Sequence, residues 1–399
     1  MRLVALLVAV LATAASADAA VTRLDRHGTV VMDGRKVFPI VLAKGPPASG
    51  LREVAAAGVN FVKVGPAGDW KDADVAQTIA DNRAAAAAGI HTWVNLSAFA
   101  RIQPGGWRES LLGYVIGMLE ADPSFAAVGM WKGSDEPWKY RMRPASLRFA
   151  YCLATGRGHR GWCAGRAPLD RRHLWVTVQA PRAGVWSLSP YAAVTDVHGV
   201  NSYPIAIGDP DPDLGEVGSW TDVLRAATPR RAVWTTLQIC WRWSYDAAGG
   251  VALPTYEQMR FMIYDAILNG ARALAFYGGQ NPKCWGQLDA AGGWNWTFWE
   301  RVLEPLVREL SGPINAALVN PGSTRELPTS NRAVRAIRRG EWVIATSSAD
   351  AGEVTIGGLP GGSITEPFDR WSVHVNRLTV AAARAPMFIR PEASHFLAR

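Results

Sequence analysis

The chain has 399 residues, of which 49% are hydrophobic, and its 42 Lys and Arg against 34 Asp and Glu give a formal net charge of +8. This length suits one large domain and a small one. The basic residues are scattered, apart from a modest cluster at residues 332–339. This distribution argues against nucleic acid as a partner and leaves an acidic substrate open.

The amino terminus resembles a secretory signal peptide. Arg2 is the only charged residue before Asp18, residues 3–15 are apolar, and small residues suited to signal peptidase follow. The apolar stretch is shorter than the about 20 residues that cross a bilayer, and no later segment is long and apolar enough to do so. We expect residues 1–20 to be a cleaved signal peptide and the mature protein to be secreted or periplasmic, with no integral membrane segment.

Residues 21–37 are predicted to form an N-terminal β-hairpin, because Asp33-Gly34 is a strong two-residue turn signal. Short apolar runs then alternate with amphipathic segments along the chain. The runs, which we interpret as strands, are residues 38–45, 60–66, 90–97, 125–137, 173–181, 196–204, 231–239 and 272–279. The clearest helices between or after them are 51–57, 75–88, 109–121, 145–155, 220–227, 256–269 and 296–310, while 187–194 has room only for a short helix.

Helix-ending signals support this assignment. Gly58, Gly89 and Gly270 stand where three of the helices end, and Thr255 is a plausible N-cap for another. Apolar strands that alternate with helices imply a parallel sheet covered on both faces. An open doubly wound sheet would usually have a glycine-rich phosphate loop after its first strand, whereas Gly45-Pro46-Pro47 follows here. Residues 38–312 are therefore predicted to form a (β/α)8 TIM barrel, of the α/β class.

Beyond Ser311-Gly312-Pro313 the pattern changes to short alternating runs separated by Gly, Pro and Asp turns. The runs are residues 333–339, 341–348, 353–357, 371–376 and 377–383. Such a pattern predicts antiparallel strands, so residues 313–399 are expected to form a small C-terminal β-sandwich.

Four cysteines in an exported chain are expected to pair. Cys152 and Cys163 flank a Gly- and Arg-rich loop, and Cys240 and Cys284 lie just beyond two successive strands, which are neighbours in a barrel. We predict the disulfides Cys152–Cys163 and Cys240–Cys284. Neither a CxxC pair nor an HExxH motif accompanies them, so no metal site is predicted, and no cofactor is implied.

Functional residues of a barrel gather at the carboxyl ends of its strands. The most distinctive such end here is GSDEPW, in which the adjacent carboxylates Asp135 and Glu136 lie between Trp131 and Trp138. A carboxyl group that is partly desolvated by indole rings, or placed beside a like charge, has a raised pKa, as a general acid for a glycosidic oxygen requires. We therefore take Asp135 and Glu136 as candidate catalytic residues.

Other side chains at the strand ends are candidates for binding a sugar, since flat sugar faces stack on aromatic rings. The candidates are Lys63, Asn95, Trp131, Lys132, Asn201, Tyr203, Gln238, Trp241, Tyr277 and Trp285. Ordinary packing and rim hydrogen bonds are the competing interpretation for the aromatic and amide residues. Lysine is rarely buried unpaired, so Lys63 or Lys132 is expected to pair with Asp135 or Glu136.

Several segments resemble divergent glycoside hydrolases of the large retaining (β/α)8 clan, over residues 28–399. They are FPIVLAKGPP, GVNFVKVGP, GMWKGSDEP, GVNSYP and TYEQMRFMIYDAILNGARALAFYGG. In that clan a Glu at the end of strand four, usually within Asn-Glu-Pro, is the acid/base. The resemblance implies this role for Glu136, with Asp135 in place of the Asn, and Tyr203 resembles a tyrosine that bonds near the nucleophile.

The clan places its nucleophilic Glu at the end of strand seven, where this chain has Gln238. An amide cannot form the glycosyl ester of a retaining reaction. Three alternatives follow: Asp135, or one of Asp69, Asp72 and Asp74, acts as nucleophile or base; the reaction is inverting; or hydrolysis is lost.

The leading prediction is a secreted glycoside hydrolase that cleaves O-glycosidic bonds of a poly- or oligosaccharide, with Glu136 as general acid. The alternative is a non-catalytic glycan-binding barrel that has lost the strand-seven nucleophile. In both cases the expected partner is a carbohydrate.

Overall fold

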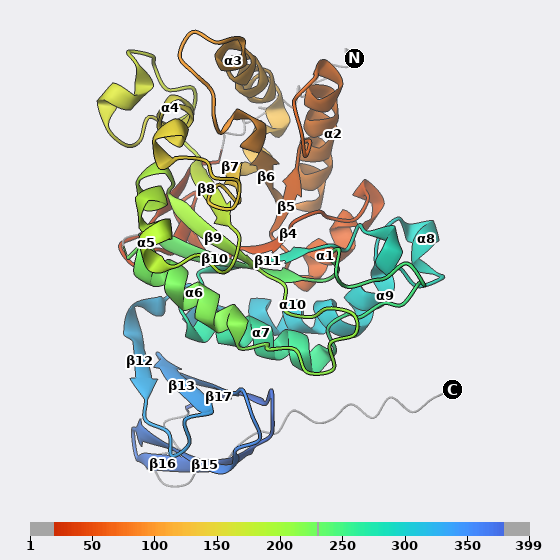
Figure 1. Ribbon diagram of the computed structural model, residues 1–399, viewed down its shortest axis with the longest axis vertical. Coiled ribbons are helices and arrows are strands. Elements are labelled where there is room, and N and C mark those ends of the chain that lie inside the picture. The colour runs from red at the N-terminus through yellow and green to blue at the C-terminus, as the bar shows by residue number, and fades with distance from the viewer. Residues whose placement is uncertain (1–19, 230, 379–399) are drawn as a thin grey trace, which may run out of the picture.

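The computed structural model describes residues 20–229 and 231–378. The predicted signal peptide, apart from Ala20, and the end of the predicted sandwich lie outside the described residues. The described chain forms a closed eight-stranded parallel barrel surrounded by helices, followed by antiparallel sheets (Figure 1). The fold class predicted from the sequence is confirmed.

A small antiparallel sheet precedes the barrel and closes its amino-terminal end. Its strands are β1 (Thr22–Leu24), β2 (Val30–Met32) and β3 (Arg35–Val37). Asp33 and Gly34 have φ values of 49° and 80°, and positive φ at both central residues is what a type I′ hairpin turn requires. Met32 packs into the barrel interior with Phe61. The expected hairpin is present, with β1 as a third strand.

The barrel strands follow the predicted runs. They are β4 (Ile40–Leu42), β5 (Phe61–Val64), β6 (His91–Asn95), β7 (Val128–Asp135), β8 (Leu174–Gln179), β9 (Val197–Ser202), β10 (Ala232–Gln238) and β11 (Ala273–Tyr277). Neighbours in the chain pair in parallel, and β11 pairs with β4 to close the sheet.

Helices cover the outside of the barrel (Figure 1). They are α1 (Leu51–Ala57), α2 (Asp72–Ala88), α3 (Trp107–Glu120), α4 (Pro144–Thr155), α5 (Val185–Leu188), α6 (Glu216–Ala227), α7 (Tyr256–Leu268), α8 (Asp289–Gly292), α9 (Trp296–Phe298), a π-helical segment at Trp299–Leu303, α10 (Glu304–Ser311) and α11 (Asn315–Leu318). Short 3₁₀ segments occur at Ala48–Gly50, Ser97–Phe99, Pro123–Ala127, Arg160–Cys163, Ser189–Val194, Pro282–Cys284 and Pro321–Ser323.

The helix-ending signals act as expected. Gly58 and Gly89 have φ values of 120° and 73°, which a side chain would oppose, and they end α1 and α2. Thr255 begins α7 in a capping box with Gln258. None of the helices in the described part of the chain has the length and apolar composition needed to cross a membrane.

The C-terminal region is a small sandwich of two antiparallel sheets. One contains β12 (Thr324–Leu327), β13 (Val334–Arg339), β14 (Trp342–Ser347) and β17 (Val373–Arg377), and the other contains β15 (Gly352–Leu359) and β16 (Gly362–Phe368). Val343, Ile356 and Phe368 share the apolar core of this region. The run predicted over 371–376 contains β17, and most of the run predicted over 377–383 lies outside the described residues, while β12 and β16 were not predicted.

Both predicted disulfides, Cys152–Cys163 and Cys240–Cys284, are present.

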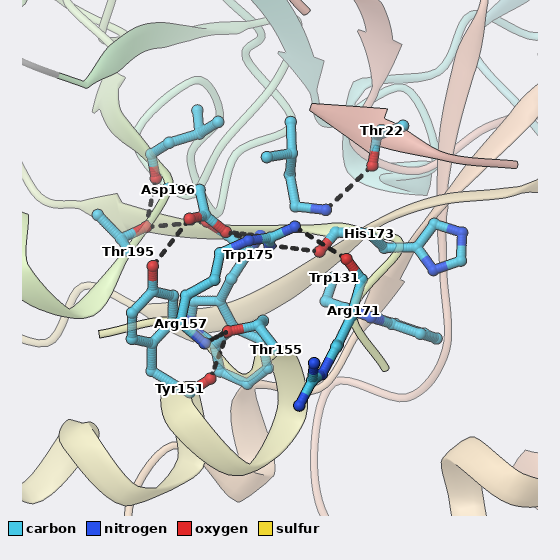
Figure 2. Close-up of polar contacts among 12 residues, drawn as sticks. Thr22, Trp131, Tyr151, Thr155, Arg157, Arg171, His173, Trp175, Thr195 and Asp196 are labelled. Carbon is cyan, nitrogen blue, oxygen red and sulfur yellow. Dashed lines mark hydrogen bonds and ion pairs between the residues drawn. The ribbon is translucent and has the colours of Figure 1, made fainter. Parts of the chain in front are cut away.

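A buried polar network joins α4 to the barrel at Tyr151, the residue before Cys152 (Figure 2). Asp196, just before β9, accepts hydrogen bonds from the Tyr151 hydroxyl and the Trp175 backbone N–H, each at 2.8 Å, and forms an ion pair with Arg157 at 2.8 Å. Burial and the Asp196 carboxylate raise the pKa of Tyr151.

We predict that Asp196→Ala lowers the free energy of unfolding by about 3 kcal/mol, because it leaves Arg157 and the Tyr151 hydroxyl without their partner. Chemical denaturation measures this change. The control is Asp222→Ala, which removes an exposed partner of Arg225 and should cost less than about 0.5 kcal/mol. Equal effects of the two variants would contradict the structural role assigned to the network.

Candidate active-site cleft

A cleft of about 830 Å³ opens at the carboxyl ends of the barrel strands. Because side chains alternate along a strand, each strand directs at least one residue at or near its carboxyl end into this space. These residues are Ala43, Lys63, Trp93, Lys132, Val178, Asn201, Thr236 and Tyr277. The segments after β7, β8, β9 and β10 supply the walls.

Glu136 lies at the end of β7 with an unusual backbone. Its φ is 44°, in the left-handed region that residues other than Gly seldom adopt, and its N–H donates to the Val178 carbonyl at 2.6 Å. Strain of this kind concentrates at functional sites. The side chain is 13% exposed; Oε2 pairs with the Lys139 ammonium, and Oε1 accepts a hydrogen bond from Asn201 Nδ2 at 3.0 Å.

Asp135 lines the same cleft and contacts a different cation. Its Oδ2 lies 2.8 Å from Lys132 Nζ, and the two side chains are 47% and 7% exposed, respectively. Lys132 Nζ also lies 5.8 Å from the centre of the Trp93 ring. The expected pairing of a barrel lysine with the DEP motif is confirmed for Lys132 and Asp135.

Lys63 extends from β5 into the cleft. Among the described residues, the groups that act on its ammonium do so as charges and not as hydrogen-bond partners: Lys132 and Lys44 repel it and Asp135 attracts it. Burial, followed by repulsion from Lys132, lowers the pKa of Lys63 to about 7, although Asp135 opposes the shift. Lys63 is therefore half-buried in the cleft without a direct ion pair in the described part of the chain.

Aromatic rings form one wall of the cleft. Tyr203 stacks on Tyr277 with 5.7 Å between ring centres and contacts Trp241 at 5.3 Å. Trp243 meets Trp241 edge to face. Burial, together with Tyr277 and the carboxylates of the DEP motif, raises the pKa of Tyr203 well above its ordinary value, so its hydroxyl stays protonated.

Four predicted substrate-binding residues do not line the cleft. Trp131 is fully buried on the outer face of β7 and donates to Asp170 at 2.7 Å; its prediction is wrong, because neighbouring residues in a strand face opposite sides. Asn95 donates to the Pro66 carbonyl at 2.5 Å, and Trp285 to the Gly279 carbonyl at 2.9 Å. The fourth residue is Gln238.

Gln238 holds two segments of the cleft wall together. It is fully buried. Its Oε1 accepts from the Ile205 N–H and its Nε2 donates to the Ile205 carbonyl, both at 2.8 Å. The Trp241 indole donates to the same carbonyl at 3.2 Å. The amide thus matches one donor and one acceptor of the β9 loop, a task that a carboxylate cannot perform.

The cleft contains two carboxyl groups that the sequence analysis did not identify, Asp209 and Glu216. Burial raises the pKa of Glu216, whose Oε1 accepts from the Ser202 hydroxyl at 3.4 Å. Most candidate residues were sought at the strand ends, whereas Glu216 begins α6 after a long loop. Cleft residues Arg182 and Arg242 were missed for the same reason.

The other carboxylates proposed from the sequence, Asp69, Asp72 and Asp74, do not line the cleft, and Asp69 pairs with Arg108 at 2.8 Å. Across the described ranges, no group of three or more His, Cys, Asp and Glu side chains is arranged to hold a metal ion.

In comparisons with known proteins, this chain is similar in fold to solved structures of glycoside hydrolases. No protein-family model matches the chain, and neither does any curated protein. A solved structure described as a glycoside hydrolase is 11% identical, with a TM-score of 0.56 over 90% of this chain and 93% of that one. A family 5 glycoside hydrolase from Bacteroides vulgatus is 12% identical, with a TM-score of 0.56 over 90% of each chain.

A putative glycoside hydrolase from the same species is 15% identical, with a TM-score of 0.52 over 87% of this chain and 70% of that one. At these identities the chain shares the fold of glycoside hydrolases, and the likeness extends no further.

We predict that Gln238→Glu destabilises the protein by about 2 kcal/mol, because a carboxylate oxygen would face the Ile205 carbonyl in a buried site. Thermal denaturation measures the loss. Gln287→Glu, at an exposed position, is the matched control and should have little effect. A stable Gln238→Glu protein would overturn the bracing role of the amide.

Proposed function

We propose that this protein is an exported glycoside hydrolase that cleaves an O-glycosidic bond of a poly- or oligosaccharide, with Glu136 as general acid. The observation that carries the proposal is the position of Glu136, at the carboxyl end of β7 in a closed barrel and facing an aromatic cleft. The two disulfides are consistent with an oxidising compartment outside the cytoplasm.

The shape and lining of the cleft support a carbohydrate as its ligand. Its volume lies within the usual range of ligand sites, about 300–1,000 Å³. The rings of Tyr203, Trp241 and Tyr277 offer contiguous apolar surface to the faces of sugar rings, while Asn201 supplies polar atoms for hydroxyl groups.

The proposed reaction uses both carboxyl groups of the DEP motif. Glu136 gives a proton to the leaving glycosidic oxygen as the bond from that oxygen to the anomeric carbon breaks. Asp135, held beside Lys132, takes a proton from the water that forms the new bond to that carbon. A water between two carboxylates predicts inversion at the anomeric centre. Lys139 is half exposed, so an entering saccharide can displace it from Glu136.

A second candidate function is non-catalytic glycan binding. Its supporting observation is Gln238, which stands where the retaining clan has its nucleophile and whose amide is fully engaged with Ile205. In this case the aromatic wall would bind a glycan that the protein does not cleave.

We predict that Glu136→Gln reduces turnover at least about 100-fold while glycan binding and the fold persist, because the amide N–H is far too weak an acid to protonate the leaving oxygen. Release of reducing ends from a glycan panel measures turnover, and calorimetry measures binding. Asp69→Asn, outside the cleft, is the control and should behave as wild type. Unchanged turnover in Glu136→Gln would overturn the assignment, and wild-type binding without any turnover would favour the second candidate.

A further inference from the structure

The lysines of the cleft differ in their pairing. Lys132 is paired with Asp135, and Lys139 is paired with Glu136. Lys63 lines the same cleft, is half-buried, and has no such ion pair among the described residues. A charged side chain that loses part of its hydration is normally paired, because that loss is costly.

The surroundings of Lys63 increase this cost. It lies beside Trp93 in the paired strands β5 and β6, and both Lys132 and Lys44 repel its ammonium. Asp135, the acid whose charge opposes this repulsion, is held by Lys132 at 2.8 Å. The ammonium of Lys63 is therefore available to an anionic group of a ligand.

We propose that Lys63 binds a carboxylate group of the saccharide, so that the substrate is an acidic glycan of the uronic acid type. The inference rests on the proposed function for the carbohydrate nature of the ligand and adds the substrate class. A charge-assisted hydrogen bond from Lys63 to a carboxylate is stronger than one to a neutral hydroxyl. The acidic sugar would lie on the cleft floor, between Trp93 and Tyr277 and beside the DEP motif.

The same arrangement gives a pH dependence. The charged and titratable groups facing Lys63 are Lys132, Lys44 and Asp135, and the pKa of Lys63 is about 7. Its ammonium is present below this pH and is lost above it. Where binding needs the ammonium, the affinity for an acidic saccharide should fall about tenfold between pH 6 and pH 8.

The test measures binding of three sets of oligosaccharides by calorimetry: neutral hexose, uronic acid, and sulfated. Lys63→Met should weaken uronic acid binding at least about tenfold and weaken neutral binding by a smaller factor. Lys283→Met removes one charge from an exposed position outside the cleft and serves as the control. Lys63→Arg keeps the charge, so it should retain uronic acid binding at pH 8.

The outcomes separate this inference from the proposed function. Equal affinity of wild type and Lys63→Met for uronic acid oligosaccharides overturns the site, while hydrolysis of neutral glycans would still support the proposed function. Binding of sulfated but not uronic acid oligosaccharides through Lys63 overturns the carboxylate assignment. Binding of acidic oligosaccharides that needs Lys63 but occurs without hydrolysis supports the site and counts against the proposed reaction.

Discussion

Closure of the sheet between β11 and β4 is the constraint on which the rest of this structure depends. With eight parallel strands in one closed register, the carboxyl ends of all strands meet at a single mouth. Successive side chains of each strand point alternately inward and outward, and this alternation determines which side chains line the mouth. The small sheet β1–β3 covers the opposite end, and within the described residues the cleft opens at the end that carries the DEP motif.

The two carboxylates at the mouth of the barrel form ion pairs with different lysines. Two consecutive carboxylates on β7 could repel each other, but each is joined to a different ammonium group, Lys132 and Lys139. Glu136 is directed toward Asn201 of β9 through a left-handed backbone conformation that β8 stabilises with a hydrogen bond. Lys63 lines the same cleft, where burial and repulsion from Lys132 lower its pKa to about 7.

Gln238 links two segments of the cleft wall. At the end of β10, its side chain is a brace with a donor and an acceptor for one backbone unit. The brace fixes the loop that carries Tyr203 against the loop that carries Trp241, so the aromatic wall depends on it. The residue therefore shapes the site without entering it.

The sequence by itself determined the eight strands, most helices, the Asp33-Gly34 turn and both disulfides, because periodicity, turn chemistry and loop order are local properties. It also placed the DEP motif at a strand end. Only the tertiary structure decided that Lys132 faces the cleft and Trp131 the helices, since strands buried on both faces show no polar alternation to reveal their orientation. The tertiary structure also decided that Gln238 bonds to Ile205 and that Glu216 lines the cleft. Contacts between loops depend on how distant segments of the chain pack.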